Sequence, residues 1–528
     1  MSARRLDFAL LGLAAFGILN AVLYTTLLPL WDGFDEPFHY GYVETLAGRH
    51  TIPKLGSTTL SQEIVQSLYL APASQVVQRN LPFVTTFSDY FALPAPERAL
   101  RRAELMRLSP ELRQRDAQGS SNYEAQQAPL AYLLMVPADL LWGREPLPRR
   151  VLYLRLFCAI AACLLQMAGT LALAQLLELD ATASRLAVFL VLSAQMFYAS
   201  VAHVSNDWLA IPLTTWTLVA LLRFWRQPQL GSASLLGWAV AAGLLTKAYF
   251  LAWLLVAAAA VAWIAARKRN SELATAFMTI VLAAAGPWYV RNLVLYGTLS
   301  GIQPAAGGAL GPAEVARAAV SLPWGQSLLP LMRGSLWTGN NSFTSFSRAT
   351  MDAMLMLLLA GAFLWLWSAR KSASRATEAL LAAGCLSFLA AVLYNCLVFF
   401  AQSKGTQVTT TPWYTQALAA PLTCLVCLGF SRSGRMGRWA GVALAGLSTY
   451  VIAATYLVKL IPMYAGCGSG RMRLPDLYNC YVRDAGARQQ LLAQTALGPP
   501  TVVTVLAGAV VVTAAALLLF HRAGQKQP

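Results

Sequence analysis

The sequence predicts an all-α polytopic membrane protein with about 12 transmembrane helices and a long first outer loop of interfacial helices. The 528-residue chain is 57% hydrophobic and only 12% charged, which is about half the charged fraction of a soluble domain. Apolar runs of roughly 20 residues, each long enough to cross a bilayer, recur along almost the whole chain. Basic residues gather in loops, as the positive-inside rule expects, so the net charge of +17 does not call for a nucleic-acid partner.

The first apolar run covers residues 7–30 and is too long for a cleavable signal peptide. Arg4 and Arg5 precede it, so we expect the N-terminus to lie in the cytoplasm. A polar segment, residues 31–127, follows this first span. Its part rich in Arg and Glu, residues 97–116, predicts short amphipathic helices on the membrane surface.

The next apolar stretch, Ala128–Trp142, is short for a span and contains Pro137 and Asp139. If it does not cross the membrane, the basic loops after it all lie in the cytoplasm, and if it crosses, all of them face outward. The bias of Lys and Arg in short loops therefore predicts an interfacial or re-entrant helix here and both termini inside. The basic loops are Arg267–Arg269, Arg370-Lys371, Arg432–Arg438 and His521-Arg522. The later spans are expected near 151–177, 186–203, 208–226, 231–247, 248–266, 272–290, 351–368, 376–400, 412–430, 438–459 and 500–520.

This topology places five segments on the outer face. They are the loop 31–150, the turn at Asn206-Asp207, the turn at Lys247, the loop 291–350 and the loop 460–499. The last of these contains Cys467 and Cys480, which would then face an oxidising compartment and form a disulfide.

The densest polar cluster begins where the first span ends, in Trp31–Tyr40. Acids and a histidine beside lipid are costly unless they pair, bind a metal or react, so Asp35 and Glu36 are candidate catalytic residues. The alternative is that both acids only charge and cap the N-terminus of a helix over residues 36–47. His39 is either a substrate-binding residue or the neighbour that orients the acids.

A further acid, Asp207, lies with Asn206 in a very short outer turn. Its alternative role is to cap the helix that starts at Trp208. Asp35 and Asp207 are separated carboxylates at one face, an arrangement suited to a shared substrate or to a shared divalent cation such as Mg²⁺ or Mn²⁺.

Basic residues on the outer side depart from the usual charge bias. Lys247 separates two spans, Arg291 ends a third, and Arg155 starts the second span. Binding of an anionic lipid phosphate explains such charges, and contact with ordinary phospholipid headgroups is the alternative. Tyr123, Glu124 and Gln127, just before the interfacial helix, are expected to line a polar cleft.

The sequence lacks the motifs that mark several classes of enzyme. It has no Gly-rich phosphate loop ending in Lys-Ser or Lys-Thr and no H-E-x-x-H zinc motif. No segment has the composition of a soluble α/β nucleotide-sugar domain, so any sugar donor would have to reach the site from the membrane.

The ordered motifs resemble the GT-C-fold glycosyltransferases that use polyprenyl-phosphate sugars, in particular the protein O-mannosyltransferase and aminoarabinose-transferase branch. The resemblance covers residues 1–300, a catalytic module that includes the outer loop 31–150. Residues 301–528 form a C-terminal transmembrane region outside it. The motifs are Asp35-Glu-Pro-Phe-His-Tyr40, Tyr123-Glu-Ala-Gln-Gln-Ala-Pro-Leu130, Arg155-Leu-Phe, Ser205-Asn-Asp207, Leu245-Thr-Lys247 and Pro287-Trp-Tyr-Val-Arg-Asn292.

The resemblance implies an inverting sugar transfer to a glycan, lipid or protein acceptor at the periplasmic face of a bacterial inner membrane. Asp35 would be the general base, and Asp207 with Glu36 or His39 would bind the acceptor or a cation. Lys247 and Arg291 would hold the lipid phosphate. The competing class is a transporter or lipid flippase. Such a protein should show inverted repeats or charges at span centres, and the sequence shows neither.

Overall fold

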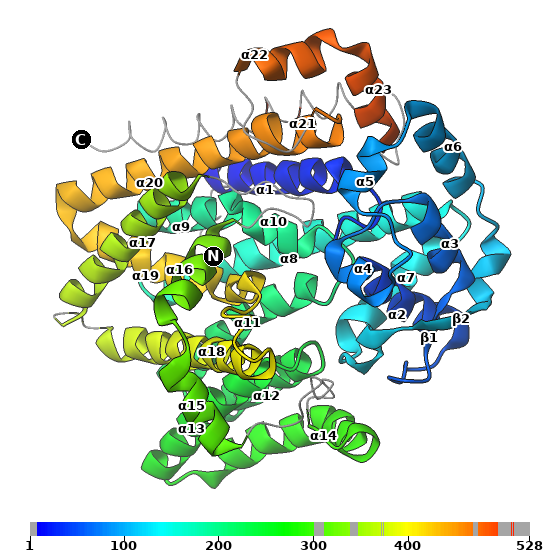
Figure 1. Cartoon of the computed structure of the whole chain (residues 1–528). Helices are drawn as coiled ribbons and strands as arrows, with labels where there is room; N and C mark the ends of the chain where they lie inside the picture. The colour runs from blue at the N-terminus through cyan, green and yellow to red at the C-terminus, as the bar shows by residue number, and fades with distance from the viewer. Residues whose placement is uncertain are drawn as a thin grey trace.

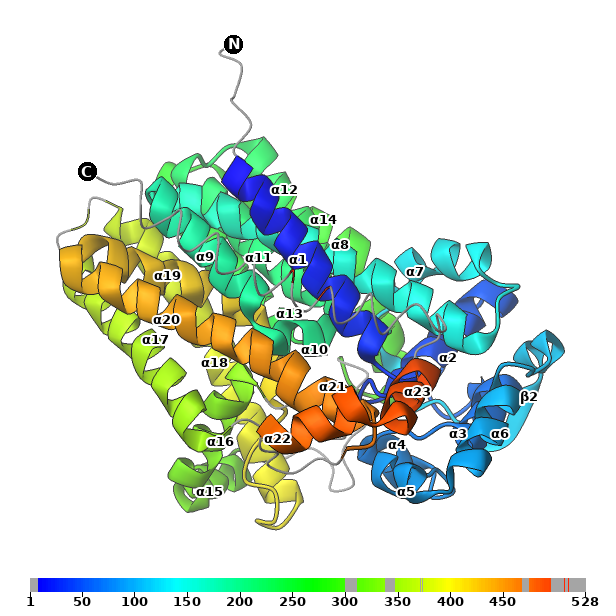
Figure 2. The same ribbon diagram turned by 90° about the horizontal axis from the view of Figure 1, so that it is seen from above.

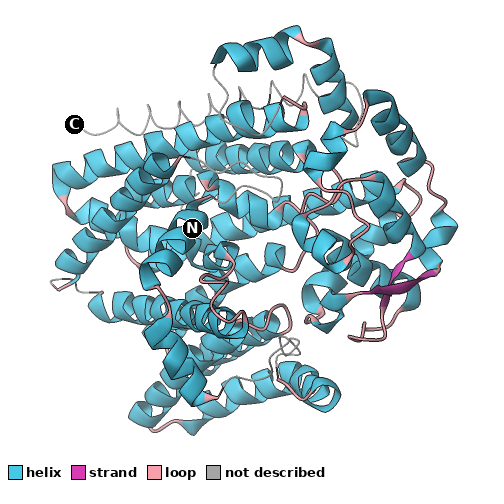
Figure 3. Cartoon of the chain, in the orientation of Figure 1, coloured by secondary structure: helices cyan, strands magenta, loops and turns pink. Residues whose placement is uncertain are grey.

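The computed structural model describes residues 8–299, 311–337, 347–467 apart from Lys371 and Ala373, 474–494, and the isolated positions 508 and 511. Within these ranges the chain is almost entirely helical, with one two-stranded ribbon (Figure 3). The ribbon pairs β1 (Thr59–Ser61) antiparallel with β2 (Asp116–Ser121). The all-α class predicted from the sequence is thereby confirmed.

Nine of the described helices are long and apolar enough to cross a membrane, or ten if one bent pair counts as a span. The bent pair is α9 (Ala181–Ser193) and α10 (Gln195–Val201), with a bend of 54° at the break between them. The nine are α1 (Phe8–Leu27), α8 (Leu147–Leu176), α11 (Asp207–Arg226), α13 (Phe250–Lys268), α14 (Ser271–Tyr296), α17 (Arg348–Ala369), α18 (Arg375–Gln402), the segment Pro412–Arg432 with η3 (Pro412–Leu418) and α19 (Ala419–Arg432), and the segment Gly434–Tyr464 with α20 (Gly434–Ala454), η4 (Thr455–Leu460) and α21 (Ile461–Tyr464).

The polytopic architecture agrees with the sequence prediction, but the count of about 12 spans is not reached in the described part of the chain. The span expected at 231–247 is α12 (Leu230–Leu244), which at 15 residues is shorter than a bilayer-crossing helix needs. The span expected at 500–520 lies outside the described residues except for two positions. The helix expected not to cross is α7 (Leu130–Leu141), which contains Pro137 and has 12 residues.

Small residues allow the long helices to pack closely. A Cβ atom added to Gly429 on α19 would lie 2.2 Å from the carbonyl oxygen of Gly361 on α17, so only glycine permits this approach. Close contact through small residues is a general means of helix association in membranes.

The segment between α1 and α8 forms a compact unit at one end of the bundle, seen at the right in Figures 1 and 2. Side chains of Ser61, Ser74 and Thr86 cap three of its short helices through hydrogen bonds to backbone N–H groups. Its helices are α2 (Glu36–Arg49), α3 (Gln62–Leu70), α4 (Gln75–Asn80), α5 (Phe87–Ala92), α6 (Ala95–Leu105), η1 (Pro110–Gln114) and η2 (Tyr123–Gln126). The C-terminal half adds α15 (Pro312–Ser321), α16 (Trp324–Leu336), α22 (Leu474–Leu477), η5 (Tyr478–Arg483) and α23 (Ala485–Gln494).

Buried ion pairs fasten this unit to the bundle. Arg150 at the start of α8 donates to Glu63 on α3 at 2.5 Å and to the hydroxyl of Tyr40 on α2 at 2.5 Å. Within the unit, Arg113 pairs with Asp139 on α7. These contacts fix the direction of α2, which carries the acidic cluster at its N-terminal end.

The structure joins Cys467 and Cys480 in the disulfide expected from the sequence, with 5.9 Å between their Cα atoms. The other six cysteines are free and buried. We expect the double replacement by serine to cost about 3 kcal/mol of stability, because the bond closes a short loop in the unfolded chain. Thermal unfolding of wild type with and without reductant measures this effect. The serine variant is the control, and a shift of its Tm by reductant would contradict the assignment.

Candidate active site

The acidic cluster is centred on Asp35, the residue that precedes α2. Asp35 holds the N-cap position but makes no side-chain hydrogen bond to the helix, so its carboxylate is not used for capping. One oxygen, Oδ1, lies 3.1 Å from Nε2 of His39 one turn later, and the other accepts a hydrogen bond of 3.2 Å from the hydroxyl of Tyr123. The Asp35 side chain retains 25% exposure, whereas His39 is buried. Asp35 therefore presents the accessible carboxylate of this cluster.

Glu124 comes to the same cluster from η2. Asn122 accepts a hydrogen bond from the backbone N–H of Glu124 and donates to the carbonyl of Phe38, which ties η2 to α2. The Oε2 atom of Glu124 lies 3.9 Å from Nδ1 of His39. That nitrogen is also 2.6 Å from the hydroxyl of Tyr132 on α7.

The three ionisable groups change one another's proton affinity. Burial opposes charge on Asp35, but the charge and hydrogen bond of His39 outweigh it and hold the pKa of Asp35 well below its usual range. Burial likewise disfavours the charged imidazole, but Asp35 and Glu124 raise the pKa of His39 to about 9. Burial raises the pKa of Glu124 to about 7, against the lowering effect of His39. Asp35 is thus a carboxylate at any physiological pH.

The second charged pair is Asp207 with Lys247. The Nζ atom of Lys247 lies 2.5 Å from Oδ1 of Asp207, and both side chains are 11% exposed. Burial disfavours the ammonium ion, but Asp207 and Tyr414 more than offset this and raise the pKa of Lys247. The Asp207 side chain is therefore an ion-pair partner rather than a helix cap.

The two clusters lie close together in the fold. The charge of Lys247 is among the causes that lower the pKa of Asp35, which places both within electrostatic reach. Asn206 beside Asp207 donates to the side-chain oxygen of Gln127 at 3.2 Å. The structure thus brings Asp35, His39, Tyr123, Gln127, Asn206, Asp207 and Lys247 into one region.

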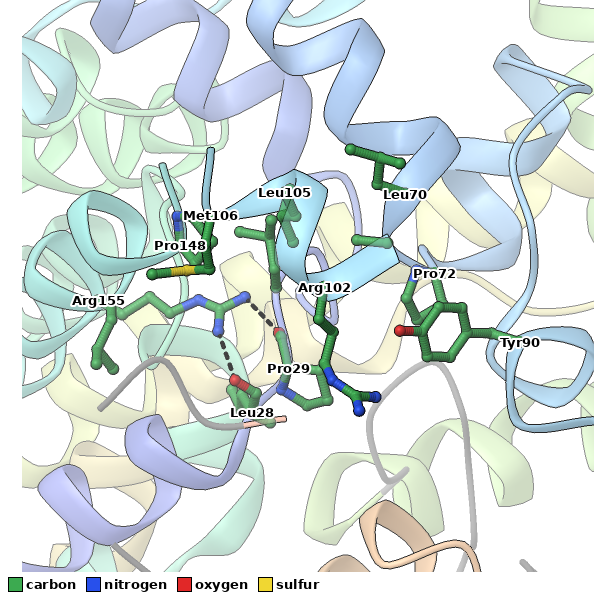
Figure 4. A pocket seen from close by; sticks show the side chains of 13 residues that line it. Leu28, Pro29, Leu70, Pro72, Tyr90, Arg102, Leu105, Met106, Pro148 and Arg155 are labelled. Carbon is green, nitrogen blue, oxygen red and sulfur yellow. Dashed lines mark hydrogen bonds between the residues drawn. The ribbon is translucent and has the colours of Figure 1, made fainter. Parts of the chain in front are cut away.

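Glu36 and Arg155 form a separate buried pair behind this region. Glu36 is fully buried and accepts two hydrogen bonds from Arg155 and one of 2.9 Å from the backbone N–H of Val204. Arg155 also donates to the carbonyls of Leu28 and Pro29, as Figure 4 shows. This almost fully buried pair holds the end of α1 and the turn before α11 in place.

Arg155 also lines a cavity of about 70 Å³, with Arg102 and Tyr90 on its other side (Figure 4). The residues around it are mostly apolar and include none of Asp35, Asp207 and Lys247. The cavity therefore lies beside the charged site and does not contain it.

Arg291, which the sequence grouped with Lys247, contacts the outer segment and the aromatic rings of α14. It donates to the carbonyl of Pro53 at 2.8 Å, and its guanidinium stacks 4.8 Å above the ring of Trp288. Arg291 therefore fastens α14 to the outer segment near Leu55, whose N–H donates to the hydroxyl of Tyr296.

Sequence reasoning missed the aromatic residues that the C-terminal half supplies. The ring of Tyr414 in η3 lies 5.0 Å from Nζ of Lys247, and the ring of Trp413 stacks 4.2 Å from that of Phe34. The only signal was the Pro-Trp-Tyr run at the start of an expected span, which reads equally well as an interfacial belt. Glu124 was noted only as a polar residue of the cleft.

Together, the fold and the site define a polytopic helical membrane protein with a charged, aromatic-walled site at one end of its bundle. No family model matches the chain, and no curated protein matches it by sequence. The structure is similar to that of ArnT from Cupriavidus metallidurans bound to undecaprenyl phosphate, with a TM-score of 0.48, 13% identity and coverage of 97% of this chain and 75% of that one. For ArnT in the apo state the TM-score is 0.41 and the identity 16%, over 90% of this chain and 73% of that one.

Proposed function

We propose that this protein is a glycosyltransferase that moves a sugar from a polyprenyl-phosphate donor to an acceptor at the outer face of a bacterial inner membrane. The ordered motifs of residues 1–300 support the class, and the charged site supports the chemistry. The observation that carries the proposal is that a partly exposed carboxylate, Asp35, and a buried lysine, Lys247, lie in one region.

The reaction needs one protein group that acts on the acceptor and another that acts on the leaving phosphate. The acceptor hydroxyl or amine attacks the anomeric carbon, the bond from that carbon to the phosphate oxygen breaks, and polyprenyl phosphate leaves. Asp35 would orient the acceptor and take up its proton, and attack opposite the leaving group would invert the anomeric centre. Because its pKa is held low, Asp35 is a weak base and would act mainly by orienting the acceptor and by its charge.

Lys247 is suited to the leaving phosphate. It already holds an anionic oxygen, that of Asp207, in a buried setting where charge-assisted hydrogen bonds are strong. A phosphate oxygen would take a similar position beside Tyr414 as negative charge develops. Arg291, which stacks on Trp288, would at most contact a part of the lipid donor away from its phosphate.

Replacement of Lys247 by Gln should raise the KM for the lipid donor and lower kcat/KM by about 10–100-fold, since a charge-assisted hydrogen bond contributes about 1.5–3 kcal/mol. Steady-state rates against donor concentration measure this. The Lys54→Gln variant, at an exposed lysine of the outer segment, should behave as wild type. An unchanged kcat/KM for Lys247→Gln would remove Lys247 from the phosphate site.

The proposal is tested with purified full-length protein and a donor radiolabelled in its sugar. Wild type should release polyprenyl phosphate and form a labelled product whose anomeric configuration is opposite to that of the donor. Retention of configuration would contradict the single-displacement step. Donor that is moved across a vesicle membrane but never consumed would favour a flippase.

A further inference from the structure

We propose that Asp35, His39 and Glu124 bind a divalent transition-metal ion, Zn²⁺ or Mn²⁺, at the N-terminal end of α2. Ion binding can be judged without any assumption about the reaction, whereas a role for the ion in transfer rests on the proposed function. The proposed ligands differ from the pair Asp35 and Asp207 expected from the sequence, because Asp207 is engaged by Lys247.

The geometry of the three side chains fits one ion. One ligand atom from each residue lies within 4.8 Å of the other two. Ligands in a tetrahedral zinc site are about 3.4 Å apart, given bonds of roughly 2.1 Å. Around His39, Oδ1 of Asp35 lies 3.1 Å from Nε2 and Oε2 of Glu124 lies 3.9 Å from Nδ1, so one of the two carboxylates must shift toward the ring nitrogen that binds the ion.

Glu124 provides an independent indication that this site binds an ion. Its side chain is 6% exposed, yet Oε2 has no hydrogen-bond partner among the residues that the structure describes. An unpaired buried carboxylate oxygen is costly, and native structures usually satisfy such atoms with a partner, water or an ion. The atom lies on the side of His39, within the proposed site.

The charges of the surrounding groups also leave room for a cation. Two carboxylates, Asp35 and Glu124, face a single imidazole. The neighbouring hydroxyls of Tyr123 and Tyr132 are neutral, and Lys247 is paired with Asp207. When Glu124 is ionised, even a protonated His39 balances only one of the two acids, whereas a divalent ion would balance both.

The ligand types indicate which ions fit. One imidazole nitrogen with two carboxylate oxygens suits Zn²⁺ or Mn²⁺, whereas Mg²⁺ and Ca²⁺ prefer oxygen ligands throughout. Binding would displace the proton from the coordinating nitrogen of His39. The partly exposed side of Asp35 leaves a direction from which an acceptor hydroxyl would reach the ion and lose its proton more readily.

The test is the metal content of the purified full-length protein, loaded with equal concentrations of Zn²⁺ and Mn²⁺, freed of excess ion by gel filtration and analysed by mass spectrometry. Wild type and the exposed control Glu111→Gln should each retain about one ion per chain. Glu124→Gln and His39→Gln should bind at least about 100-fold more weakly, since even loss of an outer partner costs 10–100-fold in affinity. Wild type that retains no more metal than Glu124→Gln would overturn the proposal and leave His39 as the cation of the cluster.

A second measurement needs no variant and so does not depend on whether the substitutions fold. Co²⁺ added to metal-free wild type should give the visible absorption of a site with nitrogen and oxygen ligands, and Zn²⁺ should abolish it. The absence of that absorption would contradict the site. Metal binding without sugar transfer would refute the proposed function alone, and full transfer by metal-free protein that binds no ion would refute the metal site alone.

Discussion

The Asp35→Asn variant should lose sugar transfer by about 10²–10⁴-fold, the usual contribution of a positioned acid–base group. Asparagine keeps the shape of the side chain and its hydrogen bond with Tyr123, but it removes the charge that faces the acceptor and His39. The loss should appear in kcat, because the carboxylate orients the attacking group of the acceptor and stabilises the charge that develops on it. Initial rates at saturating donor measure it.

The matched control for this variant is Asp89→Asn, at an exposed aspartate in the first turn of α5. It should insert into membranes, elute and unfold as wild type does, with a similar transfer rate. Asp35→Asn should also insert and fold, since its carboxylate caps no helix. A variant at Asp35 that folds and retains full activity would remove Asp35 from the chemistry.

Replacement of Arg155 by Met should destabilise the protein by about 3–5 kcal/mol, because it leaves Glu36 as a buried charge without its partner. The pair joins the end of α1, α2 and α8, and Glu36 also holds the N–H of Val204 before α11. We therefore expect a lower Tm and a loss of activity that follows the loss of folded protein.

A double-mutant cycle separates this structural role from a catalytic one. Glu36→Gln combined with Arg155→Met should cost less than the sum of the single changes, because the pair is removed as a unit. The folded fraction of Glu36→Gln should keep a kcat near that of wild type. A kcat reduced as far as in Asp35→Asn, at an unchanged Tm, would return Glu36 to the set of catalytic residues.

The sequence predicted the long helices because their apolar runs have the length of a bilayer. It predicted α2 equally well, with an acid and a proline at its start. The site residues Asp35, Asp207 and Lys247 were predictable because charge beside lipid is costly and has few uses.

The partners of these residues could not be predicted, since they depend on tertiary packing. Glu36 and Asp35 are adjacent in sequence, yet the peptide turn points one at Arg155 and leaves the other beside His39. Arg291 has the same sequence context as Lys247 but packs on Trp288. Tyr414 comes from a region more than a hundred residues beyond the recognised motifs, and no local signal links it to Lys247.

We propose that Asp35 and Lys247, at one end of the bundle, cleave the polyprenyl-phosphate sugar. The most direct measurement is the release of polyprenyl phosphate from labelled donor by wild type, Asp35→Asn and Lys247→Gln, purified side by side. The account predicts release by wild type, loss of kcat in the first variant and a raised KM in the second. Folded wild type is incubated with labelled donor and a membrane extract that contains the acceptor. Donor that stays intact, or equal release by all three proteins, would contradict the proposed function.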